Sequence, residues 1–130
     1  MIPLSKQEYI DHRLKKSADS LLAAKLLFQN NFLNETINRL YYGCFYIVTA
    51  LLFKKDIKSK THAGALNMFS LHFIKPNLLP ESMGDFYTSL FNNRQEGDYA
   101  DFSEFEKTFV ETLLAETEDF ISAVKILIGE

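Results

Sequence analysis

Hydrophobic residues near the N-terminus recur three and four positions apart, the spacing that places side chains on one face of an α-helix. Residues 6–29 form the first such segment. Ser5 and Glu8 form a capping-box pattern at its start, and Asn30 and Asn31 mark its end. Its apolar face consists of Ile10, Leu14, Ala18, Leu21, Leu22 and Phe28. The pattern therefore predicts an amphipathic helix over residues 6–29.

The second segment, residues 34–53, is apolar on two faces rather than one. Asn34 is a residue type that caps helices, so it predicts the start. One face carries Ile37, Leu40, Tyr41, Cys44, Phe45, Val48, Leu51 and Leu52, and another carries Tyr42, Tyr46 and Phe53. A helix that is apolar on more than one side is usually surrounded by other helices. We therefore expect this helix at the centre of the fold.

The pattern predicts three further helices, and the first of them begins after Thr61, a residue type that caps helices. This third helix extends to Phe73. It ends there because Lys75 precedes Pro76, and the residue before a proline disfavours helical geometry. The segment between the second and third helices, residues 54–60, is short and polar, and we expect a loop there.

Pro80 suits the first turn of a fourth helix, where its missing N–H has no cost. Arg94 lies on the apolar face of that helix, one turn beyond its last apolar residue. Ser103 and Glu106 form a second capping-box pattern, which predicts the start of a fifth helix. Its two stripes are Phe105, Phe109, Leu113, Phe120, Val124 and Leu127, and then Val110, Leu114, Ile121 and Ile128.

Five helices and no convincing strand predict an all-α antiparallel bundle with a four-helix up-and-down core, in a single domain over residues 1–130. The fifth helix carries more apolar surface than a small bundle readily buries. A homodimer would cover the excess. The alternative is that this helix lies between neighbours within the chain, and the sequence leaves both open.

Composition agrees with long helices, since 130 residues contain only five Gly and three Pro. The longest apolar run has thirteen residues, from Tyr41 to Phe53, whereas a membrane span needs about 20. No apolar signal segment follows the N-terminal charges. A single cysteine, Cys44, excludes an intramolecular disulfide and fits a reducing compartment. We expect a soluble, cytoplasmic protein with no membrane partner.

The charge is uneven along the chain. Residues 1–80 carry eleven Lys and Arg against five Asp and Glu, whereas residues 81–130 carry three against twelve. The densest basic stretch contains Lys54, Lys55, Lys58 and Lys60. It suits a phosphate or an acidic partner, or it is a solvated loop whose charges attract the acidic half of the chain. The net charge of −3 disfavours a protein that coats duplex nucleic acid.

The sequence lacks the residue patterns of metal sites, of nucleotide-binding loops and of a nucleophilic cysteine. His12, His62 and His72 lie far apart, and no Glu-x-x-His or HExxH spacing occurs, so we expect no metal site. The five glycines are isolated, which excludes a phosphate-binding loop and a dinucleotide fingerprint, and we expect no cofactor. Cys44 lies on an apolar face, where a thiol is inert rather than nucleophilic.

Polar residues associated with apolar surfaces are the remaining candidates. Arg39 shares a helix face with Tyr42, Gly43 and Tyr46, because residues three, four and seven apart are neighbours on a helix. Gly43 permits close approach of another backbone or of a ligand.

Arg94 ends an apolar stripe, and a guanidinium near a core needs a carboxylate or other acceptors. Asp98 and Asp101 are the nearest carboxylates, and Tyr99 adds a phenol. The group is either an Arg–Asp clasp that joins the fourth helix to the fifth or a functional site.

Three short blocks carry a family resemblance. They are R-x-Y-Y-x-x-F at residues 39–45, K-T-H-x-G at residues 60–64 and R-x-x-x-D-Y at residues 94–99. In this order and spacing, and followed by a long last helix, they resemble the HEPN domain, over nearly the whole chain. The resemblance implies an all-α bundle of about five helices that is frequently a homodimer.

The resemblance also implies two functions. Many HEPN proteins are metal-independent ribonucleases, and others pair with minimal nucleotidyltransferases in toxin–antitoxin or related defence systems. The ribonuclease branch carries an Arg followed, after four to six residues, by a His. Arg94 matches the first half of that motif, but Tyr99, Ala100 and Asp101 occupy the positions of the His. His62, at a predicted helix start, either replaces the missing base or only packs near its loop.

We therefore expect a non-catalytic or weakly active HEPN module that binds nucleotide or RNA, or that partners a nucleotidyltransferase. The expected ligand-binding residues are Arg39 and Arg94 for phosphate, Tyr42 and Tyr99 for stacking or hydrogen bonding, and Lys58 and Lys60 for electrostatic attraction. The alternative is a metal-independent RNA endonuclease in which Arg94 stabilises charge and His62 or Asp98 transfers the proton. A third possibility is a structural dimer with Arg94 as the clasp.

Overall fold

The computed structural model describes residues 5–99 and 105–129, with the side chains of residues 95–99 outside the described set. The described residues form helices and no strand, which confirms the all-α prediction. The elements are α1 (Lys6–Gln29), α2 (Leu33–Lys54), α3 (His62–Phe69), a π-helical turn η1 (Ser70–Ile74), α4 (Glu81–Tyr99) and α5 (Lys107–Ile128).

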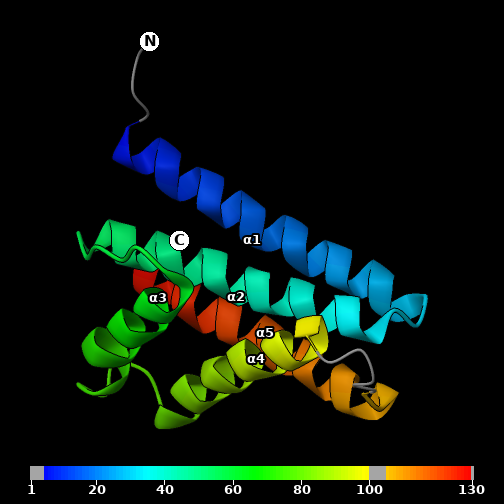
Figure 1. Cartoon of the computed structure of the whole chain (residues 1–130). Helices are drawn as coiled ribbons and strands as arrows, with labels where there is room; N and C mark the ends of the chain where they lie inside the picture. Colours follow the sequence, from blue (N-terminus) through cyan, green and yellow to red (C-terminus); the bar gives the residue numbers. More distant parts are fainter. Residues whose placement is uncertain (1–4, 100–104, 130) are drawn as a thin grey trace.

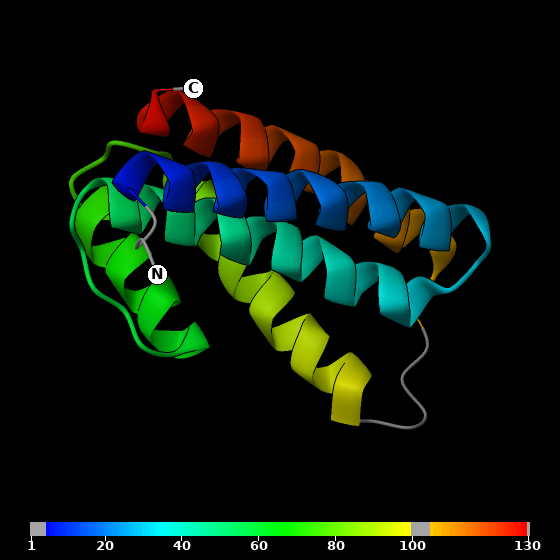
Figure 2. The same cartoon turned by 90° about the horizontal axis from the view of Figure 1, so that it is seen from above.

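Helix α2 is the centre of the bundle. Helix α1 packs along one side of it, whereas α3 and α4 lie on the opposite side, and α5 runs along α2 behind them (Figure 1). Seen from above, α1, α2 and α5 run lengthwise together, and α4 crosses them obliquely (Figure 2). This arrangement explains why the α2 sequence is apolar on two faces.

The predicted start of α1 is confirmed, and that of α2 is wrong. The Ser5 hydroxyl accepts a hydrogen bond from the backbone N–H of Glu8 at 3.1 Å, and α1 ends at Gln29 as expected. Helix α2 begins one residue before Asn34, with Phe32 in the cap position and no side-chain cap. The Phe32 N–H donates to the carbonyl of Leu27, so the tight turn after α1 fixes where α2 begins.

The start of α3 is confirmed, because the Thr61 hydroxyl accepts from the backbone N–H of Gly64 at 2.8 Å. The predicted helix to Phe73 is interrupted after Phe69, where the hydrogen-bond register changes to the π-helical turn η1. Pro80 immediately precedes α4, and its carbonyl accepts from the N–H of Met83 at 3.0 Å.

The second capping-box prediction is wrong. Helix α5 begins at Lys107, and Glu106, in an extended conformation, holds the cap position without a side-chain hydrogen bond. Because Glu106 is outside the helix, it cannot be the third helical residue that a capping box requires. Ser103 lies outside the described residues.

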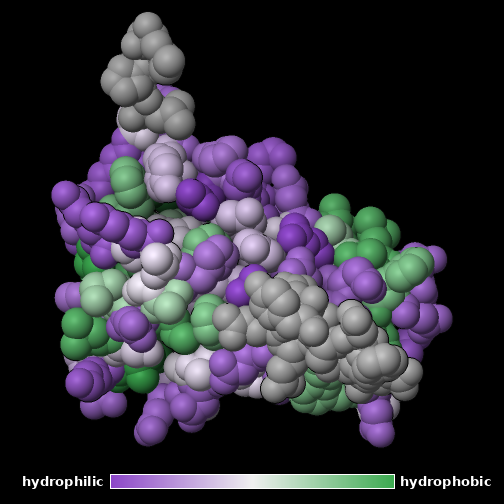
Figure 3. Space-filling model, in the orientation of Figure 1, coloured by the Kyte–Doolittle hydropathy of each residue, from purple (hydrophilic) through white to green (hydrophobic). Residues whose placement is uncertain are grey.

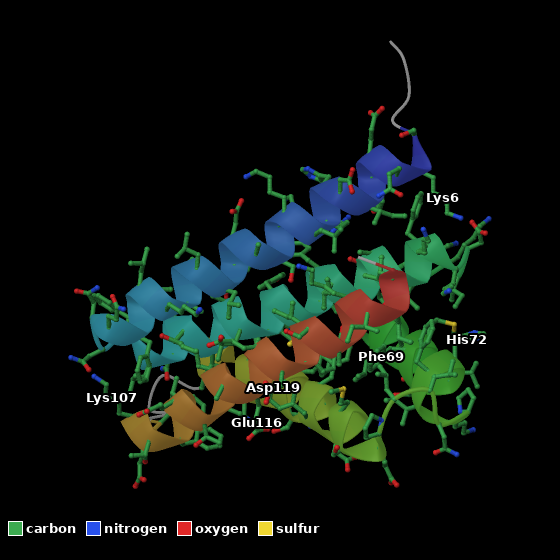
Figure 4. The ribbon with its side chains drawn as sticks, turned by 180° about the vertical axis from the view of Figure 1, so that it is seen from behind. Lys6, Phe69, His72, Lys107, Glu116 and Asp119 are labelled. Atoms are coloured by element: carbon green, nitrogen blue, oxygen red, sulfur yellow. The ribbon has the colours of Figure 1, made fainter. Side chains whose placement is uncertain are left out.

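Most of the apolar surface of α5 is buried within the chain. Phe120 contacts Phe69 and Tyr87 with ring centroids 5.6 and 5.7 Å apart, so α3, α4 and α5 meet in one aromatic core. Figure 4 shows α5 beside α3 and α4 and labels Phe69 of α3. Two large apolar side chains of α5 are exposed, Phe109 and Ile126. The helix therefore lies between neighbours, as one of the two interpretations expected.

Three exposed apolar side chains lie on the last two turns of α1 and just before α2. Leu22, Leu26 and Phe32 are more than half exposed, and Figure 3 shows hydrophobic surface at this end of the molecule. Within the described residues, no helix combines the length and the apolar character needed to span a membrane.

Helices α1 and α2 lie close together at Gly43. The buried hydroxyl of Ser17 donates to the Gly43 carbonyl at 2.8 Å. A Cβ atom at Gly43 would lie 3.5 Å from Cδ1 of Ile121 and 3.7 Å from the Ser17 carbonyl oxygen, which are ordinary contact distances. The space therefore holds one methyl group and little more.

Gly43→Ala is expected to leave stability unchanged or to raise it by about 0.5–1 kcal/mol, because alanine favours the helix and fits the space. Gly43→Leu is expected to lower stability by about 1–3 kcal/mol by overpacking the contact between α1 and α2. Urea denaturation of both variants measures the two effects. A destabilised Gly43→Ala variant would contradict the packing described here.

Candidate functional site

Tyr41 of α2 joins two of the predicted site residues. Its side chain is fully buried, and its hydroxyl lies 2.7 Å from Nδ1 of His62, at the start of α3. The guanidinium carbon of Arg94, near the end of α4, lies 4.7 Å from the centre of the Tyr41 ring, within cation–π distance. Residues from three helices thus form one cluster: Arg94, Tyr41 and His62.

The start of α3 fixes the position of His62. Thr61 caps the helix, so His62 is its first residue. The imidazole stacks on the ring of Phe45 with centroids 4.2 Å apart and meets the ring of Tyr42 edge-on at 5.7 Å. His62 remains half-buried, so part of its ring is open to solvent.

The protonation of this pair follows from its surroundings. Burial raises the pKa of the Tyr41 phenol, with the cation of Arg94 opposing the shift, so the hydroxyl keeps its proton at neutral pH. Burial and, secondly, the charge of Arg94 lower the pKa of His62 below its ordinary value of 6.5. The imidazole is therefore neutral near pH 7.

The tautomer of His62 follows from the same hydrogen bond. Within the described residues, the Tyr41 hydroxyl makes one hydrogen bond, to Nδ1. A protonated phenol donates that bond, so Nδ1 accepts and Nε2 carries the imidazole proton. The imidazole of His62 thus presents its Nε2–H donor, and no basic nitrogen, to a ligand outside the cluster.

A pocket of about 500 Å³ lies next to His62. We call it the His62 pocket. Lys58 and Lys60 line it, together with Arg13 of α1, and no acidic side chain of the described residues does. The remaining lining is mostly apolar and aromatic, including Tyr9, Phe45 and Phe53. The loop before α3 therefore brings Lys58 and Lys60 to the same pocket as His62, and their role in binding a ligand stays a prediction.

Arg39 and Tyr42 form a second pair beside the cluster. The Arg39 guanidinium carbon lies 4.8 Å from the centre of the Tyr42 ring, and Nε and Nη2 donate to the side-chain oxygen of Asn38. Tyr42 contacts both Arg39 and the ring of His62, so it links this pair to the cluster.

The structure thus brings His62, Arg94, Tyr42, Lys58 and Lys60 into one region and places Arg39 at its edge. Helix α4 extends through Asp98 and Tyr99, but their side chains lie outside the described residues, as does Asp101. The proposed clasp and the proton-transfer role of Asp98 therefore remain predictions.

Two features correct or extend the sequence interpretation. Tyr41, which the sequence pattern assigned to the apolar core, connects His62 with Arg94. The sequence feature that could have identified it is a tyrosine at a core position, because a buried tyrosine hydroxyl usually forms a hydrogen bond. Cys44 is fully buried, and burial raises the pKa of its thiol, which confirms an inert core cysteine. Among the described residues, no three His, Cys, Asp or Glu side chains gather as metal ligands would.

Comparison with known proteins identifies relatives along almost the whole chain. The sequence matches the family model of the HEPN domain over residues 10–127. It is 35% identical to a Thermotoga maritima protein named "UPF0332 protein", over 96% of this chain and 95% of the relative.

Two relatives come from Methanocaldococcus jannaschii. One, named "Putative toxin MJ0142", is 34% identical over 89% of this chain and 79% of its own length. The other, named "Putative toxin MJ0605", is 32% identical over 95% of this chain and 92% of its own length.

The charge of Arg94 is expected to lower the pKa of His62 measurably. NMR titration of the imidazole should give a pKa below 6.5 in the wild type, and Arg94→Gln should raise it towards that value without reaching it, because burial still acts. Arg94→Lys is the matched control, since it keeps the charge. Equal shifts in both variants would show that the charge is not responsible.

His62 is also expected to make stability depend on pH. Its folded pKa lies below the unfolded value of 6.5, so its contribution is complete above that pH and is lost as pH falls towards the folded pKa. The unfolding free energy of the wild type minus that of His62→Gln should therefore decrease from pH 7.5 to pH 5. A difference that is constant over this range would contradict the shift.

Proposed function

Because the chain belongs to the HEPN domain family, we propose that it is a toxin-like HEPN module that binds nucleotide or RNA and cleaves RNA weakly or not at all. The proposal rests on one observation: His62 and Arg94 contact the same buried tyrosine, Tyr41, beside a pocket lined by lysines. The names of the two Methanocaldococcus jannaschii relatives support the toxin-like part.

The groups in this region are hydrogen-bond donors. Arg94 and the lysines Lys58 and Lys60 donate and cannot accept, and His62 presents Nε2–H while Tyr41 occupies Nδ1. A phosphate group accepts such bonds and carries the opposite charge, so it is the ligand that this set of side chains favours. The aromatic rings of Phe45 and Tyr42 lie beside His62 and suit contact with a base.

RNA cleavage is the second candidate function, because His62 and Arg94 contact the same tyrosine, Tyr41, from two different helices. A general base at His62 needs an unprotonated nitrogen facing the ribose 2′-OH. That requires the proton to move to Nδ1 and the Tyr41 hydroxyl to accept instead of donate. The buried phenol would then lose the acceptor for its own proton, which is costly, and this favours binding over catalysis.

Two partners are part of the proposal. A minimal nucleotidyltransferase and a second copy of this chain are the partners that the family resemblance implies. The exposed residues Leu22, Leu26 and Phe32 offer an apolar surface for either. A purely structural role, with Arg94 only as a clasp, makes a different prediction, because it requires no ligand at the His62 pocket.

The test combines cleavage and binding. The wild type, Arg94→Ala and His62→Ala are incubated with a mixed RNA pool in EDTA near pH 7, and binding of a fluorescein-labelled ribodinucleotide is measured by anisotropy. We expect no cleavage or slow cleavage, dinucleotide binding by the wild type, and at least about tenfold weaker binding by Arg94→Ala, since a charge-assisted contact is lost.

Lys125→Ala on α5 is the control for the loss of one exposed cation, and thermal melts establish whether each variant is folded. Rapid cleavage that is abolished by either substitution would make the protein a nuclease and overturn the binding proposal. Absence of dinucleotide binding, with a large fall in the melting temperature of Arg94→Ala, would favour the clasp.

A further inference from the structure

A row of cations lies over tyrosine rings along α1 and α2, beyond the His62–Arg94 cluster. The Arg13 guanidinium carbon lies 5.2 Å from the ring centre of Tyr9 and 5.5 Å from that of Tyr46. The ammonium of Lys16 lies 5.3 Å from the Tyr46 ring centre. With Arg39 over Tyr42, three cations and three tyrosines form what we call the cation–tyrosine row.

This row joins two pockets. The His62 pocket includes Tyr9 and Arg13, and a second pocket of about 360 Å³, the Arg39 pocket, includes Lys16, Arg39 and Tyr46. Because Arg13 lines the first pocket and Tyr46 the second, their contact lies between the two. The pockets therefore follow one another along the surface formed by α1 and α2.

The cations of the row keep their charge available to a ligand. The three ion pairs of the described residues are Lys6–Asp56, Lys15–Asp19 and Lys25–Glu118, so Arg13, Lys16 and Arg39 take part in none of them. Among the described residues that line the two pockets, Asp19 is the one with an acidic side chain, and it forms an ion pair with Lys15 at 2.8 Å. A surface this basic, on a chain of net charge −3, favours a polyanion.

The size and chemistry of the row indicate single-stranded nucleic acid. From Tyr9 to Ala23, α1 extends for about 21 Å at 1.5 Å per residue, a length that several extended nucleotides cover. Tyr9, Tyr42 and Tyr46 are half-buried, so each keeps part of its surface in solvent, and aromatic side chains beside cations are the groups that bind unpaired bases. Bases stacked within a duplex cannot use such surfaces.

We propose that single-stranded RNA binds along the cation–tyrosine row, with one end in the His62 pocket and the other in the Arg39 pocket. The inference rests on the proposed function, because it extends the ligand of the His62–Arg94 cluster over α1 and α2. Lys16 and Arg39 contact its phosphates, and Tyr46 stacks with a base. The sequence block around Arg39 and Tyr42 thereby extends the site from the cluster along α2.

The experiment compares ligands of different length. Fluorescence anisotropy measures the affinity of two labelled ligands, a ribodinucleotide and an oligouridylate of ten nucleotides. The proteins compared are the wild type, Lys16→Gln, Arg39→Gln, the double variant and Tyr46→Leu. Lys125→Gln, which removes one exposed charge on α5, is the matched control. Each lost phosphate contact is expected to reduce the slope of log affinity against log salt by about 0.7 for the longer RNA.

We expect Tyr46→Leu to weaken binding of the longer RNA roughly five- to hundredfold, the range for one lost base stack, and Tyr46→Phe to retain it. Dinucleotide binding should be unchanged in Lys16→Gln and Tyr46→Leu but weakened in Arg94→Ala. If the longer RNA binds but Lys16→Gln and Arg39→Gln behave like Lys125→Gln, the row is not a binding site, although the proposed function stands.

Two other results would overturn the inference in different ways. No binding of either RNA by the wild type contradicts the proposed function together with the row. Competition by a ten-residue polyglutamate as effective as that by unlabelled oligouridylate would show a site for acidic peptides rather than for RNA. Variants that melt far below the wild type are replaced by Lys16→Met and Arg39→Met, which keep an unbranched apolar stem.

Discussion

The hydrogen bond between the Tyr41 hydroxyl and Nδ1 of His62 is the constraint on which the candidate site depends. A phenol buried at the centre of the bundle needs a partner, because an unpaired buried hydroxyl is costly. His62 supplies that partner from the first turn of α3, so the loop before α3 must bring the helix start against the middle of α2. The same bond determines which imidazole nitrogen carries the proton.

This one bond also explains how a chain without the expected histidine keeps a polar site. The positions where the nuclease motif would place its His hold Tyr99, Ala100 and Asp101, yet an imidazole still reaches the neighbourhood of Arg94 from another helix. Its free edge offers a donor. A cluster of donors beside a basic pocket is suited to holding a phosphate in place, whereas cleavage also requires a base.

The three cations of the row contact aromatic rings. Arg13, Lys16 and Arg39 each lie over a tyrosine, while one of the three ion pairs of the described residues, Lys25–Glu118, joins the basic and acidic parts of the chain. The sequence left open whether the basic half attracts the acidic half or a ligand. A cation over a ring keeps its positive charge for a further partner, and so the observed contacts favour the ligand.

The sequence by itself determined the helices and the helix that lies at the centre. Hydrophobic spacing and the side-chain caps at Ser5 and Thr61 are local properties, so they predicted the bounds of α1 and the start of α3. The predicted apolar face of α1 was wrong at Ala18 and Leu22, which are exposed, because the position of α2 decides which face of α1 is buried. The starts of α2 and α5 were predicted wrongly, because a turn contact to Leu27 and the extended Glu106 decided them. Only the tertiary structure placed His62 against Tyr41 and Arg94 and aligned Arg13 and Lys16 with Tyr46. Those contacts join residues from different helices, and a periodic pattern within one helix contains no information about which partner it will meet.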